Sequence, residues 1–259
     1  MSILKRLAVT LLPHSVLAWG KKHYYAYVVP RFWEAEVEPI TYFVHAGDSV
    51  VDLGANIGWY SVVLSRLVGE RGKVYAVEPI PETFSLLSSV IKRLGLTNVE
   101  LFNCAVSDKD GTAVMELPKH EYGGTNYYMA RIVSSKSAEP RVDRVEVPLR
   151  SVDSLFPERL SERVTFVKCD VEGHELAVLK GASQFFARVK PALMIEVTGT
   201  AAIQDAPDNE FFSIMARYGY VPYSYDGKRL RRRVKGHWSV NYFFLQDVHL
   251  PQVAHLLSD

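Results

Sequence analysis

The sequence predicts an α/β fold in which helices cover both faces of a mostly parallel sheet. From residue 49 onward, apolar segments of strand length alternate with segments of helix length. This alternation is typical of a parallel sheet, because each parallel strand needs a long crossover connection to the next. A length of 259 residues suits one such domain with a smaller appendage. The net charge of +1 provides no overall field that would favour nucleic acid as a partner.

Five apolar segments predict the strands of this sheet: 49–53, 73–77, 99–103, 164–169 and 192–197. Four of these strands are followed by segments that predict helices: 58–68, 81–94, 174–187 and 209–218. The third strand leads instead into a polar turn at 107–111. Two more strand-like segments, 220–225 and 240–246, close the chain. The second is rich in aromatic residues and predicts an antiparallel last strand near the sheet edge.

The interval between the third and fourth strands is too long for a single crossover connection. Its two alternating segments, 112–117 and 144–149, favour a hairpin. Between them lie two glycines and three tyrosines that would suit stacking on a sugar or another ring: Gly123, Gly124, Tyr122, Tyr127 and Tyr128. We predict that the insert 112–149 is a lid, with a plain surface loop as the alternative.

The first 45 residues predict a helical and aromatic appendage, and the main domain occupies residues 46–259. Residues 3–12 combine a basic end with a short apolar stretch, as a signal peptide does, but Pro13 interrupts the stretch and no cleavage site is obvious. The stretch is also far too short to span a bilayer. We expect a helix packed on the domain, with peripheral membrane contact through residues 3–19 as the alternative.

Cys104 and Cys169 lie within apolar, strand-like segments. Such positions favour buried thiols in a reducing compartment over a disulfide. Their spacing and the absence of a histidine pair argue against a zinc site. We therefore expect a cytoplasmic protein, with peripheral attachment to a membrane as the alternative.

Residues 50–58 predict a nucleotide-type ligand site, because a buried strand ends at Asp52 and a turn with Gly54 and Gly58 leads into a helix. Gly54 would let the backbone approach a ligand, and Gly58 would let the helix pack closely on the sheet. Asn56 stands where a dinucleotide-binding loop has its middle glycine. The carboxylate of Asp52 would repel a phosphate but would suit the ammonium of an amino acid. These features favour S-adenosylmethionine over a dinucleotide.

Glu78 ends the next strand and should therefore lie at the same edge of the sheet. A carboxylate offers two adjacent acceptor oxygens, which suit the two hydroxyls of a ribose. The alternative role is to favour the start of the next helix, beside Pro79. In combination with Asp52 and the glycine turn, we favour the ribose.

A second polar cluster follows the strand 164–169 and contains Asp170, Glu172 and His174. Methylation of a hydroxyl needs a base within hydrogen-bond reach, and His174 has a suitable intrinsic pKa. Asp170 or Glu172 would orient the acceptor hydroxyl, or Asp170 and Glu196 would hold a divalent cation, although we favour a site without metal. Alternatively, the acids merely favour the start of a helix and His174 lies on the surface.

Together these motifs resemble the FkbM-type family of S-adenosylmethionine-dependent methyltransferases. The resemblance covers about residues 48–200 and is carried by these motifs: Val51-Asp-Leu-Gly-Ala-Asn-Ile-Gly58, Val77-Glu-Pro79, Asn103-Cys-Ala-Val-Ser-Asp108, Lys168-Cys-Asp-Val-Glu-Gly-His-Glu175 and Leu179-Lys-Gly181. It implies a Rossmann-like class I methyltransferase sheet, S-adenosylmethionine as cofactor, and O-methylation of a small molecule, often a sugar or secondary metabolite.

The resemblance also implies roles for single residues. Residues expected to face the methionine and ribose are Asp52, Gly54, Asn56 and Glu78. Residues expected near the adenine are Ala105, Val106 and Asp108, and Gly58 and Asp170 complete the expected cofactor site. Cys169 stands where an aliphatic strand residue is expected, a departure that leaves the chemistry of the site intact.

Two other functions remain as alternatives. One is a noncatalytic S-adenosylmethionine-binding or membrane-associated scaffold, acting through the N-terminal helix and the basic run 228–235. That run could meet phosphates or an anionic lipid, but a solvated hairpin edge is the favoured interpretation. The other is a nicotinamide-dependent oxidoreductase, which Asn56 and the missing third glycine disfavour.

Overall fold

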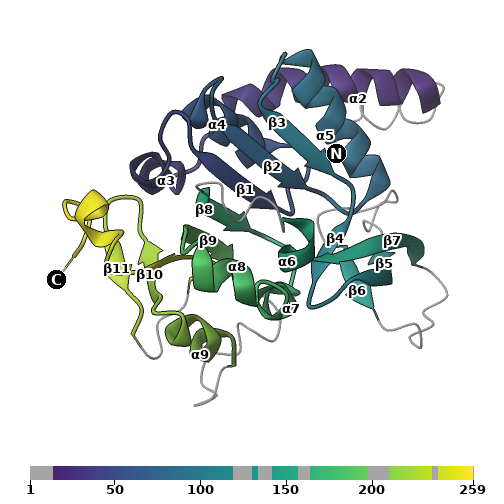
Figure 1. Cartoon of the computed structure of the whole chain (residues 1–259). Coiled ribbons are helices and arrows are strands. Elements are labelled where there is room, and N and C mark those ends of the chain that lie inside the picture. Colours follow the sequence, from purple (N-terminus) through teal and green to yellow (C-terminus); the bar gives the residue numbers. More distant parts are fainter. Residues whose placement is uncertain are drawn as a thin grey trace.

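The computed structural model describes residues 14–118, 130–133, 142–156, 164–197, 210–234 and 239–258 (Figure 1). Its main sheet has eight strands: β1 (Ser49–Leu53), β2 (Lys73–Val77), β3 (Val99–Phe102), β8 (Val164–Cys169), β9 (Ala192–Glu196), β10 (Val221–Tyr225), β11 (Leu230–Arg232) and β12 (Asn241–Leu245). Their order is β11-β10-β12-β9-β8-β1-β2-β3. All pairs from β3 to β9 are parallel, which confirms the predicted α/β class.

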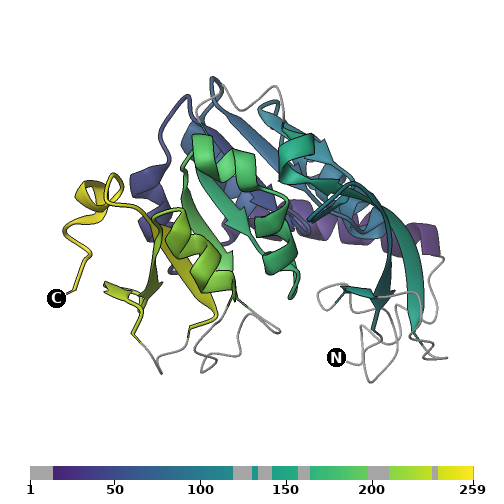
Figure 2. The same cartoon turned by 60° about the horizontal axis from the view of Figure 1, so that its bottom comes forward.

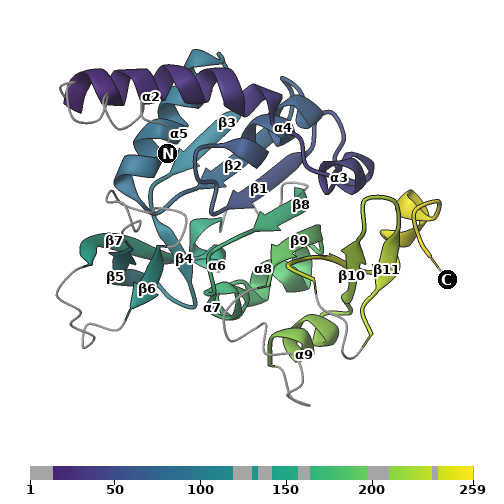
Figure 3. The same cartoon turned by 180° about the vertical axis from the view of Figure 1, so that it is seen from behind.

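The helices that surround the sheet are α2 (His14–Val28), α3 (Val37–Phe43), α4 (Trp59–Val68), α5 (Pro81–Arg93), α6 (Val152–Leu155), α7 (Glu175–Lys180), α8 (Ser183–Arg188) and α9 (Glu210–Arg217). Two short 3-10 helices are η1 (Val29–Arg31) and η5 (Leu250–Val253). Figures 1 and 3 show α2 lying along α5, so the beginning of the described chain packs against the domain. No helix among the described residues has the length and apolar character to cross a membrane.

The central strands are apolar throughout because helices cover both of their faces. Every residue of β1 is buried, and its side chains alternate between two apolar cores. Val51 and Leu53 belong to the core formed with α6, α7, α8 and α9. Val50 belongs to the core formed with α3, α4 and η5. Asp52, on the same face as Val50, is thereby directed toward α4.

The aromatic strand β12 is antiparallel, as predicted, but its expected position near the edge is wrong. It lies between β9 and β10 and pairs with both. Phe243 and Phe244 are fully buried because they belong to the apolar cores on opposite faces of the sheet. The edge strand is β11, which is antiparallel to β10. Its Arg231 and Arg232 are exposed. This arrangement agrees with the favoured interpretation of the basic run, because charged edge strands resist pairing with other chains.

The insert contains a second sheet of four strands: β4 (Ala105–Ser107), β5 (Gly111–Leu117), β6 (Arg131–Val133) and β7 (Asp143–Ser151). Its order is β4-β7-β5-β6, and Figure 2 shows it projecting at the end opposite the C-terminal segment. The predicted pairing of 112–117 with 144–149 is confirmed, since β5 and β7 are antiparallel. Two strands that the sequence did not predict, β4 and β6, extend this pair on either side. The lid tyrosines Tyr122, Tyr127 and Tyr128, with Gly123 and Gly124, lie outside the described residues.

The single helix predicted over 174–187 is two helices, α7 and α8, separated at Gly181 and Ala182. At Gly181 a Cβ atom would meet the backbone oxygen of Ser107 at 2.0 Å. The backbone therefore approaches β4 so closely that only glycine fits there. Cys104 and Cys169 are both buried free thiols, as predicted.

Candidate active site

The turn after β1 brings the ends of three strands together. The amides of Gly54 and Ala55 donate to the carbonyl of Val77 at the end of β2, each at 2.9 Å. The amide of Asp170, after β8, donates to the carbonyl of Leu53 at 3.0 Å. These bonds hold the residues after β1, β2 and β8 at one edge of the sheet, where open α/β folds bind ligands.

Glycine is required at position 54 because the backbone of Asp170 lies directly against it. A Cβ atom at Gly54 would lie 1.7 Å from the backbone oxygen of Asp170, and its φ is +78°. The expected close approach of a ligand is therefore not needed to explain this glycine. Gly58 has a φ of +97°, and a Cβ atom there would lie 2.9 Å from Leu87 of α5. It thus allows packing against a helix, not against the sheet as expected.

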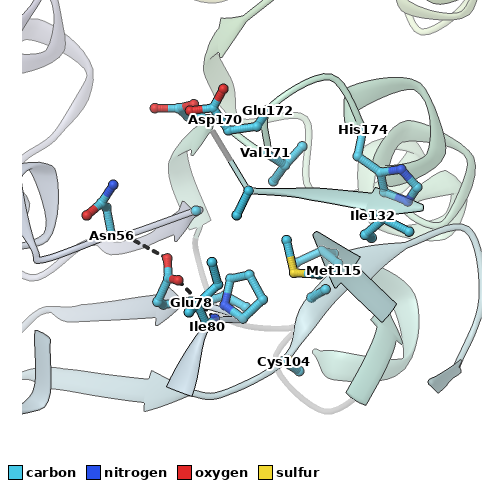
Figure 4. Close-up of a pocket in the computed structure, with 16 residues that line it drawn as sticks. Asn56, Glu78, Ile80, Cys104, Met115, Ile132, Asp170, Val171, Glu172 and His174 are labelled. Carbon is cyan, nitrogen blue, oxygen red and sulfur yellow. Dashed lines mark hydrogen bonds between the residues drawn. The ribbon is translucent and has the colours of Figure 1, made fainter. Parts of the chain in front are cut away.

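Glu78 is almost fully buried beside the turn. One carboxyl oxygen accepts a hydrogen bond from the amide of Asn56, and the other accepts from the amide of Ile80, both at 3.0 Å. Burial raises the pKa of Glu78 to about 7, and these two bonds partly oppose that shift. The expected contact with ribose hydroxyls stays a prediction, and Figure 4 shows Glu78 at the wall of the cavity beside Asn56.

Asp52 is completely buried at the end of β1. Its Oδ2 accepts a hydrogen bond from the hydroxyl of Ser61 at 2.6 Å. Its Oδ1 has no hydrogen-bond partner among the described residues. Burial raises the pKa of Asp52, while the charge of Lys168 opposes the shift. A buried acceptor without a partner costs free energy, so this oxygen is suited to a ligand that donates a hydrogen bond.

Lys168, which is buried, and Asp170, which is half-buried, form an ion pair at the end of β8, with 2.9 Å between Nζ and Oδ2. Two residues on, Glu172 has a φ of +53°, a backbone conformation that few residues other than glycine adopt. Desolvation, together with the negative charge of Asp170, raises the pKa of Glu172 to about 7. A carboxyl group with that pKa can take up a proton near neutral pH.

A first cavity, with an empty volume of about 620 Å³, lies over these strand ends (Figure 4). Predicted site residues on its wall are Gly54, Asn56, Glu78, Ala105, Val106, Asp170, Glu172 and His174. Met115, Ala130 and Ile132 of the second sheet and its flank form an apolar part of the wall. A mixed polar and apolar cavity of this kind suits an adenosine.

A second cavity, with an empty volume of about 1010 Å³, adjoins the first. The two cavities share Gly54, Asn56, Asp170 and Glu172. Asp52 and Glu196 line only the second cavity, together with residues that the sequence did not indicate: Phe32, Glu34, Trp59, Tyr60, Lys168, Met194 and Asn241. The segment 32–34 of the expected appendage thus takes part in the site.

Two predicted site residues lie away from both cavities among the described residues. Asp108 is exposed and accepts a hydrogen bond from Ser107 Oγ at 3.1 Å. Gly58 caps α4 and packs on α5. The described residues contain no group of three or more possible metal ligands, and the pair Asp170 and Glu196 stays a prediction.

His174 lines the first cavity only, and its Nε2 lies 2.9 Å from the buried hydroxyl of Ser107. Partial burial lowers its pKa, which favours the neutral imidazole. Its role as general base stays a prediction. Glu172 has the stronger geometric position because it lines both cavities.

A sequence model of the methyltransferase FkbM domain matches residues 52–222, which include the ends of β1, β2 and β8 at the site. The chain belongs to the FkbM methyltransferase family. The chain thus carries a methyltransferase FkbM domain, as its motifs implied.

Two curated relatives match parts of this FkbM-type protein. A protein-L-isoaspartate O-methyltransferase from Methanocella arvoryzae is 31% identical over 109 residues, which are 42% of this chain and 53% of that protein. Methyltransferase sdnD from Sordaria araneosa is 28% identical in an alignment of 157 residues that covers 52% of this chain and 60% of that protein. The matched regions thus span about half to three fifths of these relatives.

Solved structures are similar to this FkbM-type protein at low sequence identity. Methyltransferase FkbM from Methylobacillus flagellatus has a TM-score of 0.48 and 20% identity, over 77% of this chain and 44% of that chain. An S-adenosylmethionine-dependent O-methyltransferase from Thermotoga maritima has a TM-score of 0.44 and 17% identity, over 82% of this chain and 64% of that chain.

The residues of the site fit S-adenosylmethionine. The free oxygen of Asp52 suits the ammonium of the methionine part. Asn56 and Glu78 lie at the wall of the first cavity, which suits the adenosine part. Asp170 and Glu172 lie where the two cavities meet, and this is where the methionine and adenosine parts would join.

Proposed function

We propose that this FkbM-type enzyme transfers a methyl group to a hydroxyl of a small molecule, most naturally a sugar or a secondary metabolite. The observation that carries the proposal is the junction of two cavities at Gly54, Asn56, Asp170 and Glu172. Two reactants can approach each other at such a junction from opposite sides. Holding both in line supplies much of the rate acceleration of a transfer reaction.

The first cavity would hold the adenosine part of the cofactor, and the second would hold its methionine part together with the acceptor. S-adenosylmethionine supplies an activated methyl group, and its sulfur keeps the electron pair when the carbon–sulfur bond breaks. Asp52 anchors the amino end of the cofactor, and Glu78 faces its ribose. Glu172 accepts the proton of the acceptor hydroxyl as the oxygen forms its new bond to carbon. Lys168 holds Asp170 in place beside this junction through their ion pair.

His174 is the second candidate for the base. It lines only the first cavity, which is assigned to the adenosine part of the cofactor, and its Nε2 is in hydrogen-bond contact with Ser107. His174 would therefore act as the base only if the acceptor hydroxyl reached into that cavity. We therefore favour Glu172 as the base and a site without metal. The buried free thiols of Cys104 and Cys169 support a reducing, cytoplasmic location for the enzyme.

Calorimetric titration with S-adenosylhomocysteine, with NAD and NADP as controls, tests the cofactor site. We expect the wild type to bind S-adenosylhomocysteine saturably and to bind neither NAD nor NADP. The affinity for S-adenosylhomocysteine should fall about tenfold or more in Asp52→Ala and in Glu78→Ala. Binding of a dinucleotide instead would contradict the proposal.

Transfer of a labelled methyl group to a panel of sugars and other hydroxylated metabolites tests the reaction. We expect transfer by the wild type and a strongly reduced rate in Glu172→Gln that still binds S-adenosylhomocysteine. Cofactor binding without transfer to any compound of the panel would favour a noncatalytic, S-adenosylmethionine-binding scaffold.

A further inference from the structure

The second cavity is both acidic and aromatic, and neither property is needed to bind the cofactor's adenosine. We propose that it binds an acceptor that carries a protonated amine beside the hydroxyl to be methylated, as in an amino sugar or another hydroxylated amine. The inference rests on the proposed function, because it names the class of acceptor for that reaction.

Carboxyl groups outnumber cationic groups on the wall of this cavity. Five acidic residues line it: Glu34, Asp52, Asp170, Glu172 and Glu196. Lys168 is the one cationic side chain among the described lining residues, and its ammonium is engaged with Asp170 at 2.9 Å. S-adenosylmethionine adds one net positive charge at neutral pH, since its sulfonium and ammonium oppose one carboxylate. The cavity therefore stays negative with the cofactor in place.

Two of these carboxyl groups, those of Asp52 and Glu196, keep acceptor oxygens that no described residue engages. Asp52 is fully buried, and its Oδ1 makes no hydrogen bond. Glu196, at the end of β9, is half-buried, and no hydrogen bond or ion pair joins its carboxyl group to another described residue. Burial and the charge of Asp170 raise the pKa of Glu196, and the charge of Lys168 only partly opposes this shift. A bound ammonium group would supply the remaining positive charge.

The roles of the carboxyl groups can be separated by position. Asp52 faces the amino end of the cofactor, and Glu172 lies at the junction where the methyl group moves. Figure 4 shows the carboxyl groups of Asp170 and Glu172 pointing away from Met115 and Ile132, and both residues also line the second cavity. Glu34 and Glu196 line only the second cavity and have no role assigned toward the cofactor, so we assign them to the acceptor.

Aromatic rings complete the site for a cation. The ring of Phe32 lies 5.0 Å from that of Trp59 and 5.4 Å from that of Tyr60, measured between centroids. Tyr60 already has the ammonium of Lys168 at 4.8 Å from its ring, and its hydroxyl donates to Glu34 at 2.8 Å. Aromatic faces attract ammonium groups and also pack against the apolar face of a sugar ring. The same carboxylates would repel a phosphorylated or carboxylated acceptor.

Matched sugars test the proposal in binding experiments. Protein saturated with S-adenosylhomocysteine would be titrated at neutral pH with glucosamine, N-acetylglucosamine, glucose and glucuronate. We expect glucosamine to bind about tenfold more tightly than its acetylated form, because acetylation removes the charge but keeps the ring. Glu196→Gln and Glu34→Gln should each reduce this preference, while the affinity for S-adenosylhomocysteine is retained. Glu70→Gln, an exposed residue before β2 at the opposite edge of the sheet, serves as the control.

The results separate this inference from the proposed function. If the wild-type protein does not bind S-adenosylhomocysteine, the proposed function itself is contradicted. Protein that binds S-adenosylhomocysteine but treats the four sugars alike, prefers glucuronate or binds none of them would overturn the inference alone. An unchanged glucosamine preference in both Glu196→Gln and Glu34→Gln would also overturn it.

Discussion

Glu172 combines a backbone property, a position and a pKa that each point to a functional role. Its backbone has a φ of +53°, it lies at the junction of two cavities, and its pKa is raised to about 7. Strained backbone persists where surrounding structure holds it, and such positions cluster at functional sites. Gly173, with a φ of +89°, continues the turn. The local strain thus presents the carboxyl group at the junction.

The raised pKa of Glu172 predicts how the methyl-transfer rate depends on pH. A base must be deprotonated, so the rate should rise with pH and level off above about 7. Glu172→Gln should lower kcat roughly 100- to 10,000-fold and remove this rise. A pH series of single-turnover transfer rates, with S-adenosylhomocysteine affinity as the control for folding, measures both effects. If His174→Gln removes the rise and Glu172→Gln leaves it, the histidine is the base.

Asp52 leads to a second prediction at the scale of one residue. Asp52→Asn keeps the shape of the side chain and removes its charge. The affinity for S-adenosylhomocysteine should fall about tenfold or more, because the ammonium loses its ionic partner. The free energy of unfolding should stay equal or increase, since a buried carboxylate costs free energy in the absence of ligand. Calorimetry and denaturant titration, with the exposed Asp247→Asn as control, measure the two effects. Equal loss of affinity in both variants would contradict the assigned role.

At the scale of elements, the position of the site depends on the close backbone contact between the turn after β1 and the end of β8. Both Gly54 and Gly47 have positive φ, +78° and +93°. Gly54→Ala should destabilise the protein by more than about 4 kcal/mol, because its Cβ atom would lie 1.7 Å from a backbone oxygen. Gly47→Ala should cost only about 1–2 kcal/mol, since no atom lies within 4 Å and the backbone conformation alone is unfavourable. Chemical unfolding of both variants compares them, and similar losses would contradict this interpretation.

Local patterns predicted the elements that carry the cofactor side of the site. The apolar run before Asp52, the glycine turn and the helix after it are all readable from neighbouring residues. The break between α7 and α8 was not predictable, because Gly181 responds to the distant carbonyl of Ser107. The inner position of β12 also depends on partners far apart in the sequence. Periodicity reports burial along a strand but not which strands adjoin it.

The acceptor side of the site was hidden for the same reason. Phe32 and Glu34 come from the expected appendage, and Asn241 comes from β12. Asn241 also donates to Glu36 at 3.3 Å, which ties the appendage to the sheet. No sequence motif brings these segments together. A signal existed for Lys168, because a lysine within an apolar strand needs a buried partner, and Asp170 two residues on faces the same side.

At the scale of the whole molecule, several carboxyl groups are buried without full compensation. Burial raises the pKa of Glu78 and of Glu175 to about 7, and it also raises that of Asp52. These groups bind protons more tightly in the folded state than in the unfolded state, where a glutamate has a pKa of 4.5. The free energy of unfolding therefore falls as pH rises from about 4.5 to about 7. Asp110, whose pKa is lowered, acts in the opposite direction at lower pH.

Glu175 offers a clean test of this pH dependence. Its Oε1 accepts from the amide of Gly173 at 2.9 Å, and its Oε2 is buried without a partner among the described residues. Glu175→Gln imitates the protonated acid, so it should weaken the fall in stability between pH 4.5 and 7, by up to about 3 kcal/mol at the upper end. Denaturant titrations across this range, without cofactor, measure the slope. Glu70→Gln is the exposed control, and an unchanged slope in Glu175→Gln would show that this carboxyl group titrates alike in the folded and unfolded states.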